Sequence, residues 1–167
     1  IFSEMEGEPK NGCCPDTYYL AKEMVRKLIR CGHRQIAFFM APMEFPQQRN
    51  LLKGYREALA EAELPFQPEL VQVSSMQDGA ELAARMEYLG IPYTAAMCAN
   101  SYIQFGALNW LQQHGISVPG QKSLIGYGLN ELSHLASPQL SLYYIDTNEL
   151  IEAGMSRLME SIEDRKS

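Results

Sequence analysis

Long apolar runs are absent from this sequence, and none approaches the length of a membrane span although hydrophobic residues make up 46% of the 167 residues. The opening stretch, IFSEMEGEPKNG, has neither a basic start nor a long apolar core, so it lacks the pattern of a secretory signal peptide. Basic residues are scarce too, with 14 Lys and Arg against 20 Asp and Glu and a net charge of −6. Because nucleic-acid-binding surfaces need clustered cations, we expect none on this chain.

Cysteine pairs at metal-binding spacing are also missing. The four cysteines are Cys13, Cys14, Cys31 and Cys98, and no Cys-x-x-Cys motif occurs. Adjacent cysteines do not readily bridge each other, so we expect free thiols in a reducing cytoplasm. A zinc site would need paired spacings that this sequence does not contain, and we expect neither a metal nor a cofactor.

Motifs of the common catalytic sites are missing as well. The sequence contains no GxSxG, no Walker A and no GxGxxG pattern. His33, His114 and His134 are scattered, and neither of the first two stands beside a Cys, Ser or acid in a nucleophile arrangement. No pair of carboxylates stands apart from the other acidic residues. We therefore expect a binding protein and not an enzyme.

Short apolar segments alternate with segments of helical spacing along the whole chain. Helical spacing predicts helices at residues 16–31, 51–62, 78–89, 101–114 and 151–162. Continuous apolar runs between them predict strands at residues 35–42, 69–75, 93–99, 122–128 and 140–146. Strands that are apolar throughout are typical of parallel sheets covered by helices on both faces. The sequence therefore predicts an α/β fold with doubly wound parallel sheets.

Polar and aromatic residues follow the ends of the predicted strands, where open parallel sheets bind ligands. This set suits a small polar molecule and comprises Met43 to Arg49, Ser74, Ser75, Asn100, Ser101, Tyr127 and Gly128, with Asp16 before the first helix. Structural roles fit some of them equally well. Ser101, Asp78 and Asp16 suit helix N-caps, and Arg49 suits an exposed helix start. Asn100 is the strongest ligand candidate because its amide both donates and accepts hydrogen bonds.

Four segments in order resemble the effector-binding region of the LacI/GalR family of bacterial transcription regulators. They are AKEMVRKLIRCGHRQIAFFMAP, KGYREALAEAEL, AAMCANSYIQFGALNWLQQHGISVPGQKSLIGYG and SPQLSLYYID. The most specific parts are the Gly-His-Arg-x-Ile-Ala joint at residues 32–37 and the Gly-Ile-Ser-Val-Pro stretch at residues 115–119. The resemblance covers essentially the whole chain.

This resemblance implies a type I periplasmic-binding-protein-like fold in which two Rossmann-like lobes close on a small effector. Residues 33–137 would form most of the C-terminal lobe, and residues 1–32 with 141–167 would form part of an incomplete N-terminal lobe. The family acts as homodimers and binds operator DNA through a helix-turn-helix headpiece that this chain does not contain. The start at Ile1 instead of Met fits a piece of a longer regulator, which we expect to be a repressor.

The resemblance also implies positions for the effector cleft and the dimer interface. Cleft positions of the family match Asp16, Phe45, Gln47, Ser75, Asn100 and Gly128. Arg49 and Tyr127 are further candidates because they lie beside the ends of predicted strands. Phe105 is expected either in the core or at the dimer interface.

The chain departs from the family pattern at three of these positions. Leu51 stands where the family often has arginine, Ser101 where it commonly has aspartate, and Gly128-Leu129 where it commonly has an acid. Loss of carboxylates removes acceptors for sugar hydroxyls and reduces repulsion of an anionic ligand. We expect a sugar, a sugar acid or a related metabolite, and a cleft that has lost its effector is the other possibility. A periplasmic sugar-binding protein of the same architecture is the alternative function, which a signal peptide in the upstream sequence would reveal.

Overall fold

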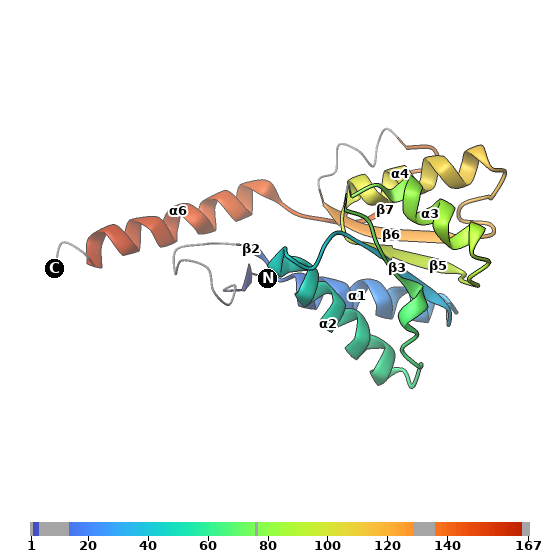
Figure 1. Ribbon diagram of the computed structural model, residues 1–167. Coiled ribbons are helices and arrows are strands. Elements are labelled where there is room, and N and C mark those ends of the chain that lie inside the picture. The colour runs from blue at the N-terminus through green and yellow to red at the C-terminus, as the bar shows by residue number, and fades with distance from the viewer. Residues whose placement is uncertain (1, 4–13, 76, 129–135, 165–167) are drawn as a thin grey trace. The chain divides into compact units, whose positions relative to one another are not determined.

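The computed structural model describes residues 2–3, 14–75, 77–128 and 136–164. The chain forms two compact units (Figure 1). Residues Thr17–Tyr144 form the larger one, called here the sheet unit. Ile1–Asp16 and Ile145–Ser167 form the smaller one, called here the terminal unit.

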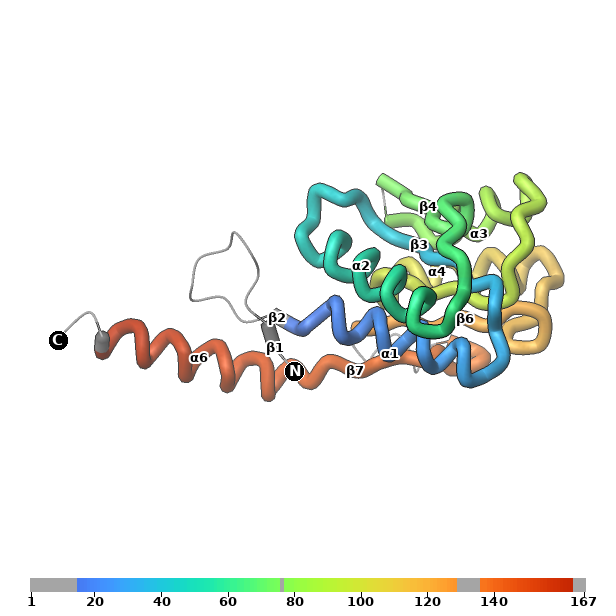
Figure 2. The backbone as a smooth tube through the Cα atoms, turned by 90° about the horizontal axis from the view of Figure 1, so that it is seen from below, coloured from blue at the N-terminus to red at the C-terminus, as the bar shows by residue number. Residues whose placement is uncertain are grey.

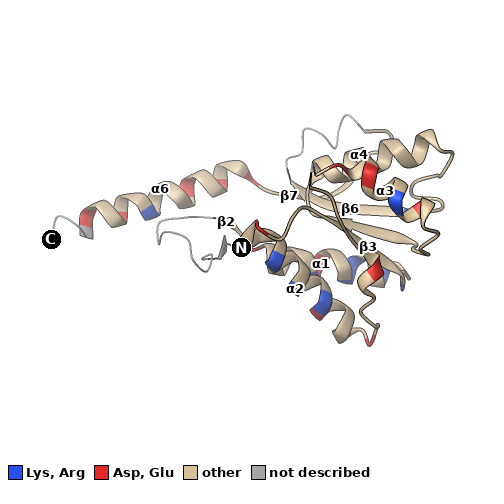
Figure 3. Cartoon of the chain, in the orientation of Figure 1, with Lys and Arg blue, Asp and Glu red and all other residues tan. Residues whose placement is uncertain are grey.

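A five-stranded sheet with the strand order β4-β3-β5-β6-β7 forms the centre of the sheet unit. All four neighbouring pairs of strands are parallel. In chain order the strands are β3 (Ile36–Met40), β4 (Val71–Val73), β5 (Ala95–Cys98), β6 (Ser123–Gly128) and β7 (Ser141–Tyr144). None of them contains a charged residue, and the described Lys, Arg, Asp and Glu residues of this unit lie on helices and loops (Figure 3). The predicted parallel α/β fold is confirmed.

Helices cover both faces of this sheet. Helices α1 (Thr17–Arg30) and α2 (Pro46–Glu61) lie on one face, and α3 (Gly79–Tyr88) and α4 (Ser101–Gln113) lie on the other (Figure 1). Figure 2 shows α1 and α2 side by side. The predicted helix at residues 51–62 begins earlier, at Pro46, because proline suits a first helical turn that needs no N–H donor.

The two central strands carry the core. Every residue of β3 and of β5 is buried, whereas the edge strands β4 and β7 are only partly covered. Burial on both faces explains why these central segments are apolar without alternation. The core continues into the inner faces of the four helices, which contribute Met24, Leu51, Tyr55, Leu82 and Ile103 among others.

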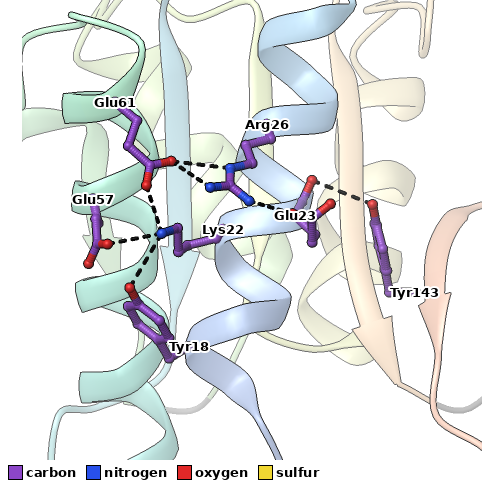
Figure 4. Close-up of polar contacts among 7 residues, drawn as sticks. All are labelled: Tyr18, Lys22, Glu23, Arg26, Glu57, Glu61 and Tyr143. Atoms are coloured by element: carbon purple, nitrogen blue, oxygen red, sulfur yellow. Dashed lines mark hydrogen bonds and ion pairs between the residues drawn. The ribbon is translucent and has the colours of Figure 1, made fainter. Parts of the chain in front are cut away.

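The sheet unit extends beyond residues 33–137 at both ends. Helix α1 and strand β7 belong to the sheet unit and not to the segments on either side of it. The apolar stripe of α1 is buried in the same core, and β7 pairs in register with β6. The Tyr143 hydroxyl also donates to the Glu23 carbonyl at 3.4 Å, which joins β7 to α1 (Figure 4). The division of the whole protein into two lobes stays a prediction.

Charged side chains bridge α1 and α2 on their exposed sides (Figure 4). Lys22 Nζ donates to Glu57 Oε1 at 2.9 Å and to Glu61 Oε1 at 2.7 Å, and Arg26 Nη2 donates to Glu61 Oε2 at 2.7 Å. Hydrogen bonds from Lys22 and then Arg26 lower the pKa of the Glu61 carboxyl. Such exposed pairs add little free energy, so the packing beneath them must hold the two helices together.

Gly54 sets the close approach of α1 and α2. A Cβ atom at this position would lie 2.3 Å from the Tyr18 carbonyl oxygen and 2.9 Å from the Ala21 Cβ. Real Cβ atoms do not come so close to backbone atoms, so no other residue fits here without moving the helices apart.

The terminal unit contains a short antiparallel pair and a long helix. Strands β1 (Phe2–Ser3) and β2 (Cys14–Pro15) pair with each other, and helix α6 spans Thr147–Asp164. Exposed apolar side chains recur along α6 at Ile151, Met155, Leu158, Met159 and Ile162. In the described part of the chain, no helix is both long and apolar enough to cross a membrane.

We predict that Gly54→Ala destabilises the protein although alanine is the better helix former. Crowding in a packed interface costs about 1–3 kcal/mol, against a gain in helix propensity of about 1 kcal/mol. Urea unfolding measures the change. Ala60→Gly on the exposed side of α2 is the control, because it isolates the propensity effect. A Gly54→Ala variant as stable as the parent would contradict the close approach.

Candidate ligand-binding edge of the sheet

The carboxyl ends of β3, β4, β5 and β6 lie at one edge of the sheet because all of these strands are parallel. We call this edge the carboxyl edge and define it as residues 41–49, 74–75, 77–78, 99–101 and 127–128. Backbone hydrogen bonds hold its segments together, since Ser74 N donates to Met40 O at 3.1 Å and Ala99 N donates to Phe39 O at 2.8 Å. Most of the predicted ligand residues therefore belong to one edge of one sheet.

The segment after β3 carries three predicted ligand residues. Phe45 is 48% exposed, and its side chain makes no capping bond at the start of α2. Gln47 is half-buried, and its backbone carbonyl accepts a hydrogen bond from Thr17 Oγ1 at 3.4 Å. Arg49 is exposed and donates to the Met43 carbonyl at 3.3 Å. Neighbouring Gln48 is structural, because its buried Oε1 accepts from Ala41 N at 3.1 Å.

The segment after β4 is held by its own side chains. Ser74 is buried, and its Oγ donates to Glu81 Oε2 at 2.6 Å and accepts from Asp78 N at 3.1 Å. The Asp78 Oδ1 accepts from Ala80 N at 2.9 Å, which confirms the predicted N-cap of α3. Ser75, the predicted ligand residue, is exposed beside this group.

Asn100 has two structural partners at the end of β5. Its Oδ1 accepts from Ile103 N at 2.9 Å, and its Nδ2 donates to Gln77 Oε1 at 3.0 Å. The N-cap of α4 is therefore Asn100, and the prediction of Ser101 as the cap is wrong. The extended backbone at Asn100 satisfies the cap geometry, whereas Ser101 is already helical. One amide hydrogen and one oxygen lone pair of Asn100 remain for a ligand.

Ser101 and Gly128 fit against each other. Ser101 is 3% exposed, and a Cβ atom at Gly128 would lie 2.8 Å from Ser101 Oγ. Gly128 also has a φ of +148°, a backbone angle that residues other than glycine rarely adopt. Two of the positions where this sequence departs from the family pattern therefore share one small space.

Tyr127 lies one residue before the end of β6 and stands opposite Tyr143 of β7. Its side chain packs against the hydrophobic core, and burial raises its pKa to about 12. The hydroxyl is therefore neutral at physiological pH and can still donate a hydrogen bond.

Two further predicted residues belong to other segments of the chain. Asp16 is the last residue of the first terminal segment, directly before α1, and its role stays a prediction. Phe105 is half-buried on α4 and packs against the core, while its role in a dimer interface stays a prediction.

Several residues named above lie wholly or partly outside the described part of the chain. Leu129, His134 and Cys13 are outside it, and of Cys14 only the backbone is described. Cys31 and Cys98 are free thiols as predicted, and burial raises the pKa of Cys98. Among the described residues, no group of three or more His, Cys, Asp or Glu is placed so that it could hold a metal ion.

Two residues with roles here, Gln77 of this edge and Glu81 of α3, were not predicted from the sequence. The spacing of Asp78 and Glu81 matches a capping box, so this motif could have drawn attention to Glu81. Gln77 gives no comparable signal. It adopts a φ of +53° and contacts Asn100, which is 23 residues further along the chain.

Residues 25–167 match a family described as the periplasmic binding protein-like domain. The chain is 30% identical over 81% of its length to the HTH-type transcriptional regulator AscG of Escherichia coli K12, covering 41% of that protein. It is 31% identical over 89% of its length to the HTH-type transcriptional repressor PurR of Vibrio parahaemolyticus, covering 44% of that protein. A LacI-family regulator from Burkholderia phymatum has a similar structure, with a TM-score of 0.82, 28% identity and coverage of 95% of this chain and 58% of that one. The chain thus spans less than half the length of these two curated relatives.

We predict energetic coupling between Gly128 and Ser101. Gly128→Ala should destabilise the protein by about 1–3 kcal/mol through crowding. In the double variant with Ser101→Ala part of this loss should return, because the nearest atom is removed. A double-mutant cycle in urea measures the coupling, with Ser101→Ala alone as the control. Strictly additive free energies would show that the two positions do not share space.

Proposed function

The chain belongs to the periplasmic binding protein-like domain family, in the form carried by LacI/GalR regulators, and on this premise we propose that it is the effector-sensing part of a transcriptional repressor. The observation that carries the proposal is the carboxyl edge of the sheet. There the Asn100 amide keeps one donor and one acceptor free, and the exposed residues Phe45 and Ser75 belong to the same edge.

The effector we propose is a sugar acid or a related small metabolite. Arg49 supplies a cation at this edge, whereas Glu81 is already bonded to Ser74 and Arg85. Leu51 is fully buried and packs in the core, so this position offers an effector no cationic partner. Gln47, Asn100 and the backbone at Gly128 would bind hydroxyl groups, and the rings of Phe45 and Tyr127 would contact apolar faces of the ligand.

A regulator is favoured over the alternative of a periplasmic sugar-binding protein. The two relatives compared above are both named as HTH-type transcriptional proteins. Operator DNA would be bound through a headpiece outside this chain, which agrees with the net charge of −6. The regulator would act in the cytoplasm, where the Cys31 and Cys98 thiols stay reduced.

We propose that the full-length protein is a homodimer and that Phe105 lies close to its interface. Sedimentation velocity on the full-length protein should give a dimer, and Phe105→Ser should shift the population toward monomer. Leu108→Ala on the same helix is the control for core damage, because Leu108 is buried. A monomeric parent protein would contradict this arrangement.

A ligand screen tests the function directly. Sugars, sugar acids and nucleosides are added to the full-length protein, and thermal unfolding is followed. A ligand at 100 times its Kd stabilises the native state by about 2.7 kcal/mol, so even weak ligands are detected at high concentration. We expect sugar acids to stabilise more than the matching neutral sugars. The reverse order would contradict the proposed effector class.

Asn100 variants separate effector binding from the capping of α4. Asn100→Asp keeps an oxygen for the cap but loses the amide donor, so stability should change little while effector binding weakens by about 1–3 kcal/mol. Asn100→Ala should lose the cap as well, at a cost of about 1 kcal/mol of stability. Calorimetry and urea unfolding measure the two effects. Unchanged affinity in Asn100→Asp would remove Asn100 from the site.

A further inference from the structure

A cavity lies at the opposite edge of the same sheet. Its volume is about 250 Å³, and it opens where β6 and β7 begin and where α1 ends. Apolar side chains such as Leu28, Leu124 and Leu140 form much of its wall, and all three are themselves buried. It shares no residue with the carboxyl edge, so it belongs to a different site.

An apolar hollow of this size is large enough to hold a ligand. Protein interiors are packed as densely as organic crystals, and unfilled voids are few and small. An apolar cavity of about 150 Å³ can hold benzene. A cavity of 250 Å³ therefore has room for a somewhat larger apolar group.

The charges around this cavity have one sign. Lys27 is its only formally charged lining residue at neutral pH, and no Asp or Glu is among the described residues that line it. His33 lines it as well, with Nδ1 2.9 Å from Thr94 Oγ1, and burial lowers its pKa. The Thr94 hydroxyl donates to Gln35 O, so His33 Nδ1 carries the hydrogen in the neutral ring. Lys27 is therefore the formally charged residue beside an apolar space.

We propose that this cavity binds a small monocarboxylate whose apolar body fills the space and whose carboxylate pairs with Lys27. The apolar wall supplies most of the binding free energy, and the lysine selects the anion over neutral or cationic molecules of the same shape. The site is separate from the proposed effector site and does not depend on it.

The labelling rate of the Cys31 thiol measures whether a ligand occupies the cavity. Its thiol is exposed and lines the cavity, whereas the Cys98 thiol is buried in the core. In the full-length protein, iodoacetamide labelling is followed by peptide mass spectrometry, which measures the rate at Cys31 alone. Octanoate is the probe, octanol and octylamine are the head-group controls, and butanoate and hexanoate vary the chain length. Cys98 is the internal control for unfolding.

We expect octanoate to slow labelling of Cys31 at least fivefold at saturation, with Cys98 unlabelled throughout. Affinity should rise about threefold to fourfold for each added methylene until the cavity is full. Octanol and octylamine should bind several times more weakly than octanoate. Equal protection by all three head groups would overturn the proposal, as would a Cys31 thiol that does not react even without ligand.

Two variants and one control complete the test. Lys27→Gln should weaken octanoate binding about threefold to fivefold, the range for loss of one exposed ion pair. Ser141→Phe should fill the cavity and abolish protection, with circular dichroism confirming the fold. Lys53→Gln removes an exposed lysine of α2 outside the cavity and should change nothing. Unchanged octanoate affinity in Lys27→Gln would overturn the proposed pairing even if Ser141→Phe did not fold.

Discussion

The central strands β3 and β5 lie where no side chain reaches water, and the rest of the sheet unit is arranged around them. Their register places Ile36 opposite Ala95 and Phe38 opposite Met97, and all four side chains are buried. Helices must then cover both faces, and they approach closely through Gly54 on one face and Gly79 on the other.

Parallel pairing gives the two edges of the sheet different chemistry. At the carboxyl edge, helices α3 and α4 begin, and their free N–H groups are capped by Asp78 and Asn100. Polar side chains are therefore required there for folding before any ligand is considered. Asn100 could serve both purposes because an amide offers more hydrogen-bonding groups than one cap uses.

The sequence predicts the features that depend on neighbouring residues and misses those that depend on distant ones. Apolar runs and helical spacing place all five strands of the sheet unit, and in β3 and β5 every residue is buried and apolar. The choice between Asn100 and Ser101 as the cap depends on where the strand stops, and both residue types are good caps. The bond from Asn100 to Gln77 and the pairing of β7 with β6 join distant segments, and no local pattern reveals them. Family resemblance gives the candidate site its positions but not the contacts made there.

Gln104 links the two edges of the sheet through a hydrogen bond and a close packing contact. It lies on α4, one turn after the Asn100 cap, and it is fully buried. Its Nε2 donates at 2.9 Å to the carbonyl of Ser141, which lines the opposite cavity, and a Cβ atom at Gly126 would lie 2.6 Å from its Oε1. A helix that starts at the carboxyl edge is thereby hydrogen-bonded to the strand that starts beside the cavity. If ligands at the two edges influence each other through this contact, thermodynamic linkage requires each to change the affinity of the other by the same factor.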